Sequence, residues 1–342
     1  MKYMLTISWL LWLLLFTVNI CWAYKGLYIM NHGTRSHLSF HKAILETLSE
    51  IGHKITFVTP YNTKYNIKNV TEILLKENWT DKLLGNPFNN SNGLSMVWNF
   101  FEYGPKSCTG PLGDPAMLKA LEEDYDYVLI SIFLSECFLT VPYVKKIPFI
   151  YVFQNIIVPP YSERTGSVDF GSISPTRTYM QAKEENLWPP EVPDIFELLK
   201  QPAFAIINSV RALEYPTRPM SPSVVYVGGI HIKEPQPLPQ ELADWLDGSG
   251  EEGFIFFSLG TVIKAEHLKQ EHISSILKVF GSLKQRILWK WNSEIKNLPS
   301  NVKISSWLPQ QDILDIKLGS RLKLFVKTCK SSKYNKKYAS YV

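Results

Sequence analysis

The stretch KGLYIMNHGTRSHLSFHKAILETLSEIGHKITFVTP, residues 25–60, decides the fold class. Its start, 26–30, is a short apolar run, and apolar residues then recur at near-helical spacing over 38–51. Gly52 marks the end of this helix, and the run 55–58 is rich in β-forming residues. The pattern therefore predicts a βαβ unit with a right-handed crossover over a parallel sheet.

Three later apolar runs extend this sheet. They occupy 127–130, 148–152 and 204–207, and they lack the alternation of a half-exposed strand. Parallel strands that are covered on both faces have this character. The sequence therefore predicts a doubly wound α/β domain over 24–234, followed by a Pro-rich linker over 235–240.

A second α/β series follows the linker. Strands are predicted at 253–258, 286–291 and 302–304, and helices at 242–246 and 268–283, the second of them amphipathic. We expect this second Rossmann-like domain, 241–326, to be incomplete, because the chain continues into a divergent basic tail, 327–342. Open α/β sheets bind ligands at the carboxyl ends of their strands, so two such domains favour a two-substrate enzyme with a site between them.

The first 23 residues have the features of a secretory signal. Lys2 precedes the apolar run 9–16, and Cys21-Trp22-Ala23 offers small residues for cleavage. An uncleaved anchor is the alternative, but the run is shorter than the roughly 20 residues of a spanning helix. We therefore expect a location in the endoplasmic reticulum lumen. Three Asn-X-Ser/Thr triplets beginning at Asn69, Asn78 and Asn89 would then lie in a glycosylated luminal loop.

Charge and cysteines exclude two further classes. The net charge is +5, but the segment 317–342 holds eight Lys or Arg and no acid, which leaves −3 for the rest of the chain. The basic character thus gives no support to nucleic-acid binding. After signal removal the cysteines are Cys108, Cys137 and Cys329, and an odd, widely spaced set predicts no disulfide framework.

His37 is the first candidate for chemistry. It lies between the first strand and the first helix, where an imidazole can take a proton from a hydroxyl at neutral pH. The alternative is a loop histidine or a helix cap. His37 and His41 have a spacing that can bind zinc, but the glutamate of HExxH is absent and no third ligand is apparent, so we expect no metal. Gly33 stands in this turn without a GxGxxG pattern, which disfavours a dinucleotide oxidoreductase.

Two segments of the second domain are candidates for nucleotide binding. Ser258-Leu259-Gly260-Thr261 follows a strand, and its small residues would let backbone N–H groups approach a phosphate. Trp307, with Gln310 and Gln311 close behind it, offers a flat ring for a base and amides for the base edge. The alternatives are an ordinary turn glycine and a core tryptophan.

Together these motifs resemble the UDP-glycosyltransferases, specifically their UDP-glucuronosyltransferase-like branch in animals. The resemblance covers roughly 24–326. It is carried by Ser36-His37, Asn208-Ser209, Glu214-Tyr215-Pro216, Val227-Gly228-Gly229-Ile230-His231, Phe256-Phe257-Ser258-Leu259-Gly260-Thr261 and Trp307-Leu308-Pro309-Gln310.

The resemblance implies an α/β GT-B fold and an inverting transfer of a hexose or glucuronic acid from a UDP-sugar to a hydroxyl of a small lipophilic acceptor. The UDP-sugar is a co-substrate, and no other cofactor is expected. His37 matches the base, Trp307 and Gln310 match uracil contacts, and the phosphate-proximal turn corresponds to Ser258, Gly260 and Thr261. Full-length relatives are a further expected partner.

Two departures from the family's pattern stand out. An acid that orients the base is expected near the end of the strand 127–130, where Ser131 stands; we assign Glu136 to this role, with a solvated charge at a helix start as the alternative. After 322–326 the family continues with a Thr-His-Gly-Gly stretch, an Asp-Gln pair and a transmembrane helix, none of which occurs here. We therefore expect a C-terminally truncated chain. The alternatives are an inactive isoform that binds ligands or full-length relatives, and a tail translated from an intron.

Overall fold

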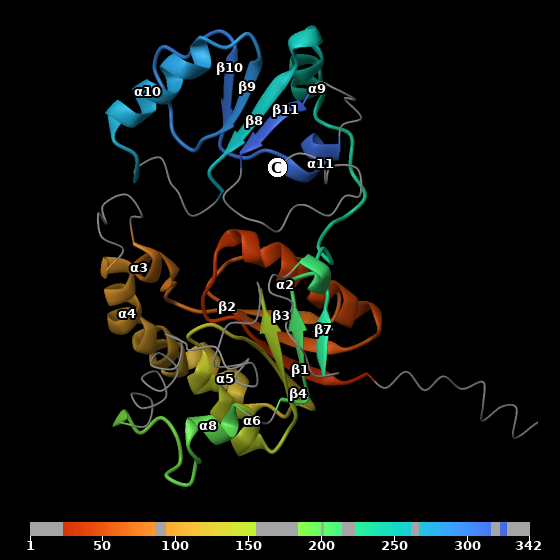
Figure 1. Cartoon of the computed structure of the whole chain (residues 1–342). Coiled ribbons are helices and arrows are strands. Elements are labelled where there is room, and N and C mark those ends of the chain that lie inside the picture. Colours follow the sequence, from red (N-terminus) through yellow and green to blue (C-terminus); the bar gives the residue numbers. More distant parts are fainter. Residues whose placement is uncertain are drawn as a thin grey trace, which may run out of the picture.

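The computed structural model describes residues 23–85, 94–154, 184–199, 202–213, 223–260, 267–315 and 322–326. They form two sheets, one in each half of the chain, joined by an extended segment (Figure 1). The first sheet has the strand order β3-β2-β1-β4-β5-β6-β7 and the second β10-β9-β8-β11. The predicted signal, apart from its last residue, and the predicted tail lie outside the described residues.

The strands of the first sheet are β1 (Lys25–Ile29), β2 (Lys54–Thr59), β3 (Val70–Leu74), β4 (Tyr127–Ser131), β5 (Phe149–Phe153), β6 (Phe204–Ile207) and β7 (Val224–Tyr226). The helices of this half are α2 (Arg35–Glu50), α3 (Thr80–Leu84), α4 (Leu94–Leu112), α5 (Pro115–Glu122), α6 (Thr140–Lys145) and α8 (Ile195–Leu198), with short 3-10 helices η1 (Glu136–Leu139) and η4 (Arg211–Leu213).

The second sheet consists of β8 (Phe254–Ser258), β9 (Arg286–Lys290), β10 (Val302–Ser305) and β11 (Leu322–Val326). Its helices are α9 (Gln240–Asp247), α10 (Gln270–Gly281) and α11 (Gln310–Asp315), with a 3-10 helix η5 (Gly250–Glu252). The strand pairs described in both sheets are parallel. The parallel α/β architecture predicted from the apolar runs is confirmed.

The predicted βαβ unit is β1, α2 and β2, with β1 in the middle of the first sheet. Leu27 and Ile29 of β1 pack with Val128 of β4 on one face, whereas Tyr28 packs on the other face with Leu45 of α2. All these side chains are buried. Burial on both faces is the reason why these strands show no polar alternation.

The polar stretch that contains the sequons is not simply a loop, so that prediction is wrong. Residues 70–74 form β3, which pairs with β2 at the edge of the sheet. An edge strand that is only partly buried tolerates polar residues, and its pattern therefore resembles a loop in sequence. Thr80, from the second sequon, begins α3 and is 6% exposed. The third sequon lies outside the described residues.

Cys108 of α4 and Cys137 of η1 form a disulfide with their Cα atoms 6.0 Å apart. The odd number of cysteines had predicted no disulfide framework, and this bond corrects that expectation. The pairing is tertiary: 29 residues separate the two cysteines in sequence. It depends on α4, which contains Pro105 and Pro111 and was not predicted because proline usually breaks a helix interior.

Candidate functional site

The carboxyl ends of the strands in each sheet share one edge, because the strands are parallel. In Figure 1 the arrowheads of β7 in the first sheet and of β8 and β11 in the second point toward each other. The turn after β1, which leads to His37, therefore lies on one edge, and the segments after β8 and β10 lie on the other. The two groups of predicted site residues thus belong to edges that face the same region.

The turn after β1 is held at Gly33. The Thr80 hydroxyl donates to the Gly33 carbonyl (2.9 Å) and accepts from the Gly33 N–H (3.0 Å), and the Tyr61 hydroxyl also donates to this carbonyl. Gly33 has a φ of +147°, and a Cβ there would lie 2.8 Å from Met30 Cε and 3.2 Å from His37 Nδ1. Only glycine fits this conformation without strain. The sequence patterns singled out Gly33 but not its two hydrogen bonds with the Thr80 hydroxyl.

His37, in the first turn of α2, is partly buried, and its Nδ1 accepts the backbone N–H of Thr34 at 3.1 Å. The capping alternative is therefore what the structure shows. Because Nδ1 accepts, the proton of the neutral ring lies on Nε2. Burial lowers the pKa of His37 to about 4, so the ring is neutral at pH 7. A neutral imidazole can take up a proton, although one of its nitrogens is already engaged.

A buried polar chain lies behind His37. His41 is fully buried, with its Nδ1 2.5 Å from the Tyr28 hydroxyl and its Nε2 3.0 Å from Gln154 Nε2. The Gln154 side chain also contacts the Ser131 hydroxyl at 2.5 Å. Both nitrogens of His41 are thus engaged by protein groups. Among the described residues no group of His, Cys, Asp and Glu could hold a metal ion.

Glu136 is 2% exposed at the start of η1, so the alternative of a solvated charge is wrong. Its charge contributes, after burial, to the raised pKa of Tyr151. Tyr151 packs with Leu27 on the face of the sheet opposite α2. Burial alone lowers the pKa of His37. Glu136 therefore interacts with Tyr151, and its assigned role beside His37 stays a prediction.

The turn after β8 is held by a local hydrogen bond. Ser258 is buried, and its hydroxyl accepts the Gly260 N–H at 3.3 Å. Gly260 has a φ of +81°, which favours glycine. Lys290, at the end of β9, points its ammonium to the Gly260 carbonyl at 3.5 Å, a cation that the sequence patterns did not mark. Thr261 lies outside the described residues.

Trp307 follows β10 and is 71% exposed, so the core alternative is wrong. Its carbonyl accepts the Ser305 hydroxyl at 2.6 Å, and Leu308 next to it is buried. Gln310 is the first residue of α11. In the second sheet β9 lies between β10, which Trp307 follows, and β8, which ends at Ser258. The structure thus brings the predicted uracil and phosphate contacts to one edge of the second sheet.

Lys233, just before the linker, and Gln236 within it contact helices of both halves. The Lys233 ammonium lies 2.9 Å from a carboxylate oxygen of Glu46 on α2, and its carbonyl accepts the side-chain N–H of Gln311 on α11. Three residues on, the Gln236 N–H donates to Asp312 at 2.9 Å. No sequence pattern indicated these contacts. They connect the helix that carries His37 with the helix that begins at Gln310.

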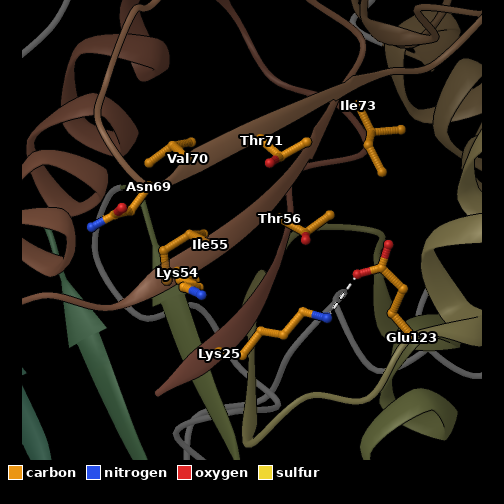
Figure 2. A pocket seen from close by; sticks show the side chains of 9 residues that line it. All are labelled: Lys25, Lys54, Ile55, Thr56, Asn69, Val70, Thr71, Ile73 and Glu123. Carbon is orange, nitrogen blue, oxygen red and sulfur yellow. Dashed lines mark ion pairs between the residues drawn. The ribbon is translucent and has the colours of Figure 1, made fainter. Parts of the chain in front are cut away.

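A pocket of about 340 Å³ lies at the opposite, amino edge of the first sheet (Figure 2). Its polar lining residues are Lys25, Lys54, Thr56, Asn69, Thr71 and Glu123. Lys25 and Glu123 form an ion pair across it at 2.8 Å. No predicted site residue lines this pocket. It is therefore separate from the candidate site.

Comparisons with known proteins now add to this geometry. Residues 191–317 match the family model described as "UDP-glucoronosyl and UDP-glucosyl transferase". The chain is 26% identical to UDP-glucosyltransferase 2 of Dactylopius coccus over 82% of its own length, and 25% identical to human UDP-glucuronosyltransferase 2B17, again over 82%. The chain is therefore similar to UDP-glycosyltransferases over most of its length. It spans 62% of the length of each of these two relatives.

Solved structures show which fold this chain has. The glycotransferase of kitacinnamycin matches with a TM-score of 0.58 at 17% identity, covering 89% of this chain and 75% of the other. UDP-glucose: anthocyanidin 3-O-glucosyltransferase in complex with UDP matches with a TM-score of 0.54 at 14% identity, covering 90% and 76%. The GT-B fold expected from the sequence is confirmed.

Proposed function

We propose that this chain carries the acceptor domain and part of the donor domain of an inverting glycosyltransferase, which moves a hexose or glucuronic acid from a UDP-sugar to a hydroxyl of a small lipophilic acceptor. The observation that carries this proposal is the pairing of two facing edges. One presents a neutral imidazole, His37, and the other an exposed indole, Trp307, beside the turn at Ser258. The similarity to UDP-glycosyltransferases supports the same reaction.

In the proposed step the acceptor oxygen forms a bond to the anomeric carbon while the bond from that carbon to the diphosphate oxygen breaks. UDP leaves with the electron pair, and His37 takes the hydroxyl proton. Because Nδ1 accepts from Thr34, uptake at Nδ1 requires release of that hydrogen bond. Uptake at Nε2 requires that the ring first moves its own proton to Nδ1. Acceptor binding must therefore adjust the cap before proton transfer.

The donor would be held by the second domain. We assign uracil to the exposed ring of Trp307, where stacking on an aromatic ring contributes about 1–3 kcal/mol by analogy with nucleic-acid sites. The Gln310 amide would contact the base edge. The diphosphate would meet the turn from Ser258 to Thr261, with the Lys290 ammonium close by. A cation near the departing diphosphate stabilises charge that grows in the transition state.

We also propose that the chain works in the lumen of the endoplasmic reticulum. The signal-like first 23 residues and the sequons support this location, and so does the disulfide between Cys108 and Cys137, because such bonds persist in oxidising compartments. No helix among the described residues is long and apolar enough to cross a membrane. Microsomal fractionation with protease protection tests this location.

A transfer assay tests the reaction. Purified full chain would be incubated with radiolabelled UDP-glucose or UDP-glucuronic acid and phenylphenol, and the glycoside would be measured. His37→Ala should lower the rate by roughly 100-fold or more, as expected for loss of a general base. His272→Ala is the matched control, because His272 lies on α10, exposed. Equal rates for the wild type and His37→Ala would contradict the assignment.

Binding without turnover is a second candidate function. Two observations favour it: the Thr34 N–H occupies Nδ1 of His37, and Ser131 rather than an acid ends β4 beside Gln154. The chain would then bind lipophilic ligands, or a full-length relative, and transfer nothing. Calorimetry that detects phenylphenol binding together with an absent glycoside would favour this candidate. Product formation by the purified chain would exclude it.

A further inference from the structure

His32 is buried, and it lies in the same turn as Gly33 with 6% of its surface exposed. Among the residues that the structure describes, neither Nδ1 nor Nε2 of its ring has a hydrogen-bond partner. Burial, and secondarily the charge of His37, lowers the pKa of His32 to about 3, so its neutral ring carries one donor and one acceptor. Leaving such groups unpaired is costly, and a native protein that keeps them calls for an explanation.

An aromatic surface lies against this ring. The Phe133 ring packs on His32 with centroids 5.6 Å apart, and the Phe100 ring of α4 meets Phe133 edge-on at 5.8 Å. Phe133 is 43% exposed, although the residues on either side of it are buried. Solvent therefore reaches Phe133 directly, while His32 lies beneath it.

The segment that presents Phe133 is strained. Leu134 has a φ of +53°, a left-handed conformation that leucine rarely adopts. Strain of this kind persists only where surrounding contacts impose it, and it concentrates at ligand sites. Here the neighbour Ser135 donates its hydroxyl to the Asn31 side chain at 2.6 Å, and Asn31 in turn donates to the Ser107 carbonyl at 2.9 Å.

These contacts hold the turn and the Phe133 segment together. Asn31 precedes His32, Ser135 follows Leu134, and Ser107 belongs to α4. The backbone around the imidazole is thus fixed from three elements, while the ring nitrogens have no hydrogen-bond partner in the described part of the chain. A group that is positioned but unpaired, next to His37 and under an exposed phenyl ring, fits a role in binding the acceptor.

We propose that His32 is a specificity-determining residue that hydrogen-bonds a second polar group of the acceptor, next to the reacting hydroxyl, while the acceptor's ring packs on Phe133 and Phe100. This inference rests on the proposed function, because it takes the reacting hydroxyl to lie at His37. The ligand class is an aromatic molecule with two neighbouring oxygen atoms. Binding requires the Phe133 ring to turn aside and expose His32.

Calorimetry with two probes tests this role without any turnover. Phenylcatechol has two adjacent hydroxyls and phenylphenol has one. The wild-type chain should bind phenylcatechol about tenfold more tightly, the effect of one well-placed hydrogen bond. His32→Phe keeps an aromatic ring and removes both nitrogens, so it should bind the two probes equally. It should also raise Tm, because two unpaired polar atoms leave the interior.

Two further variants keep the test decisive. His53→Phe is the matched control: His53 bonds the Tyr127 hydroxyl at 2.7 Å near the amino edge of the sheet, and its loss should leave the probe preference unchanged. If His32→Phe does not fold, His32→Gln keeps a polar group and should retain part of the preference. An unchanged preference in His32→Phe, or an equal loss in His53→Phe, would overturn the inference. The transfer assay with His37→Ala tests the proposed function separately. A failure of that function can therefore be distinguished from a failure of the His32 assignment.

Discussion

The edge of the first sheet and the edge of the second sheet are built differently. Around His37 the turn is clamped by Thr80 and Tyr61 and backed by the buried chain from Tyr28 to Ser131. Around Trp307 the indole is 71% exposed, and the contacts nearby involve its backbone. The first edge is therefore pre-organised, whereas the second presents a surface that a nucleotide would complete. Mutations should accordingly affect stability at the first edge and ligand affinity at the second.

Acid should have the largest effect on the first edge. Burial lowers the pKa of His32, His37 and His41 to about 3, 4 and 3. The unfolded chain, with a histidine pKa of about 6.5, binds these protons first. Stability should therefore fall as the pH drops below about 6.5 and level off near the folded pKa values, by up to about 1.4 kcal/mol per pH unit for each histidine. Urea denaturation at several pH values measures this dependence.

His41→Gln sharpens this test, because it removes one of the three buried histidines. The slope of unfolding free energy against pH between 4.5 and 6 should fall by about one third if each histidine contributes equally. His272→Gln, at an exposed position, should leave the slope unchanged. A slope that both substitutions reduce equally would contradict the assignment of acid sensitivity to the buried cluster.

Thr80→Val should produce the next largest effect. It conserves the shape of the side chain but removes both hydrogen bonds to Gly33 and leaves a buried N–H unpaired. We expect a loss of roughly 2–4 kcal/mol in the free energy of unfolding. Thr71→Val is the matched control at an exposed position on β3, where the change should cost less than about 0.5 kcal/mol. Chemical denaturation of the pair gives the comparison.

Trp307→Ala tests the second edge, where affinity rather than stability should change. UDP binding measured by calorimetry should weaken by about 1–3 kcal/mol, the typical value of a lost stack. The unfolding midpoint should barely move, because the ring is exposed. Trp98→Ala removes an equally exposed indole from α4, where 68% of the residue is accessible. Equal loss of UDP affinity in both variants would show that Trp307 has no special role.

The smallest effect is expected at the connection between the two edges. Lys233→Ala removes the ion pair with Glu46, whose partners are exposed by 61% and 27%. Such pairs contribute about 0.2–1 kcal/mol and weaken as salt rises. Unfolding at low and high salt measures the contribution. Lys303→Ala, which breaks the pair with Glu241 inside the second half, should cost a similar amount, so a much larger loss at Lys233 would indicate strong coupling between the halves.

Periodicity explains which parts of the fold were predictable. The strands β1, β2, β4 and β5 are buried on both faces, and their apolar runs reflect this directly. The partly buried edge strand β3 and the proline-containing helix α4 depend on tertiary contacts that outweigh local preference. For that reason neither they nor the disulfide that involves α4 could be derived from sequence patterns.

The candidate site shows the same division. The position of His37 after β1, and of Trp307 after β10, followed from the order of strands and motifs. The hydrogen-bonded chain behind His37 could not be predicted in this way. Gln154, Ser131 and His41 meet only when three separate segments fold together. Glu136 illustrates the limit: its short distance in sequence from β4 favoured a role beside His37, whereas its burial in η1 and its interaction with Tyr151 arise only in the folded chain.

The bond between Cys108 and Cys137 has a consequence for how the chain can be made. It fastens α4 to the segment just after Phe133 and Leu134, so the surface formed by Phe133 and Phe100 has a covalent tether. Synthesis in a reducing cytosol would leave that tether open, and this surface would depend on packing alone. A preparation from bacterial cytoplasm and one from a secretory host could thus share every amino acid and still differ in how firmly they hold a ligand.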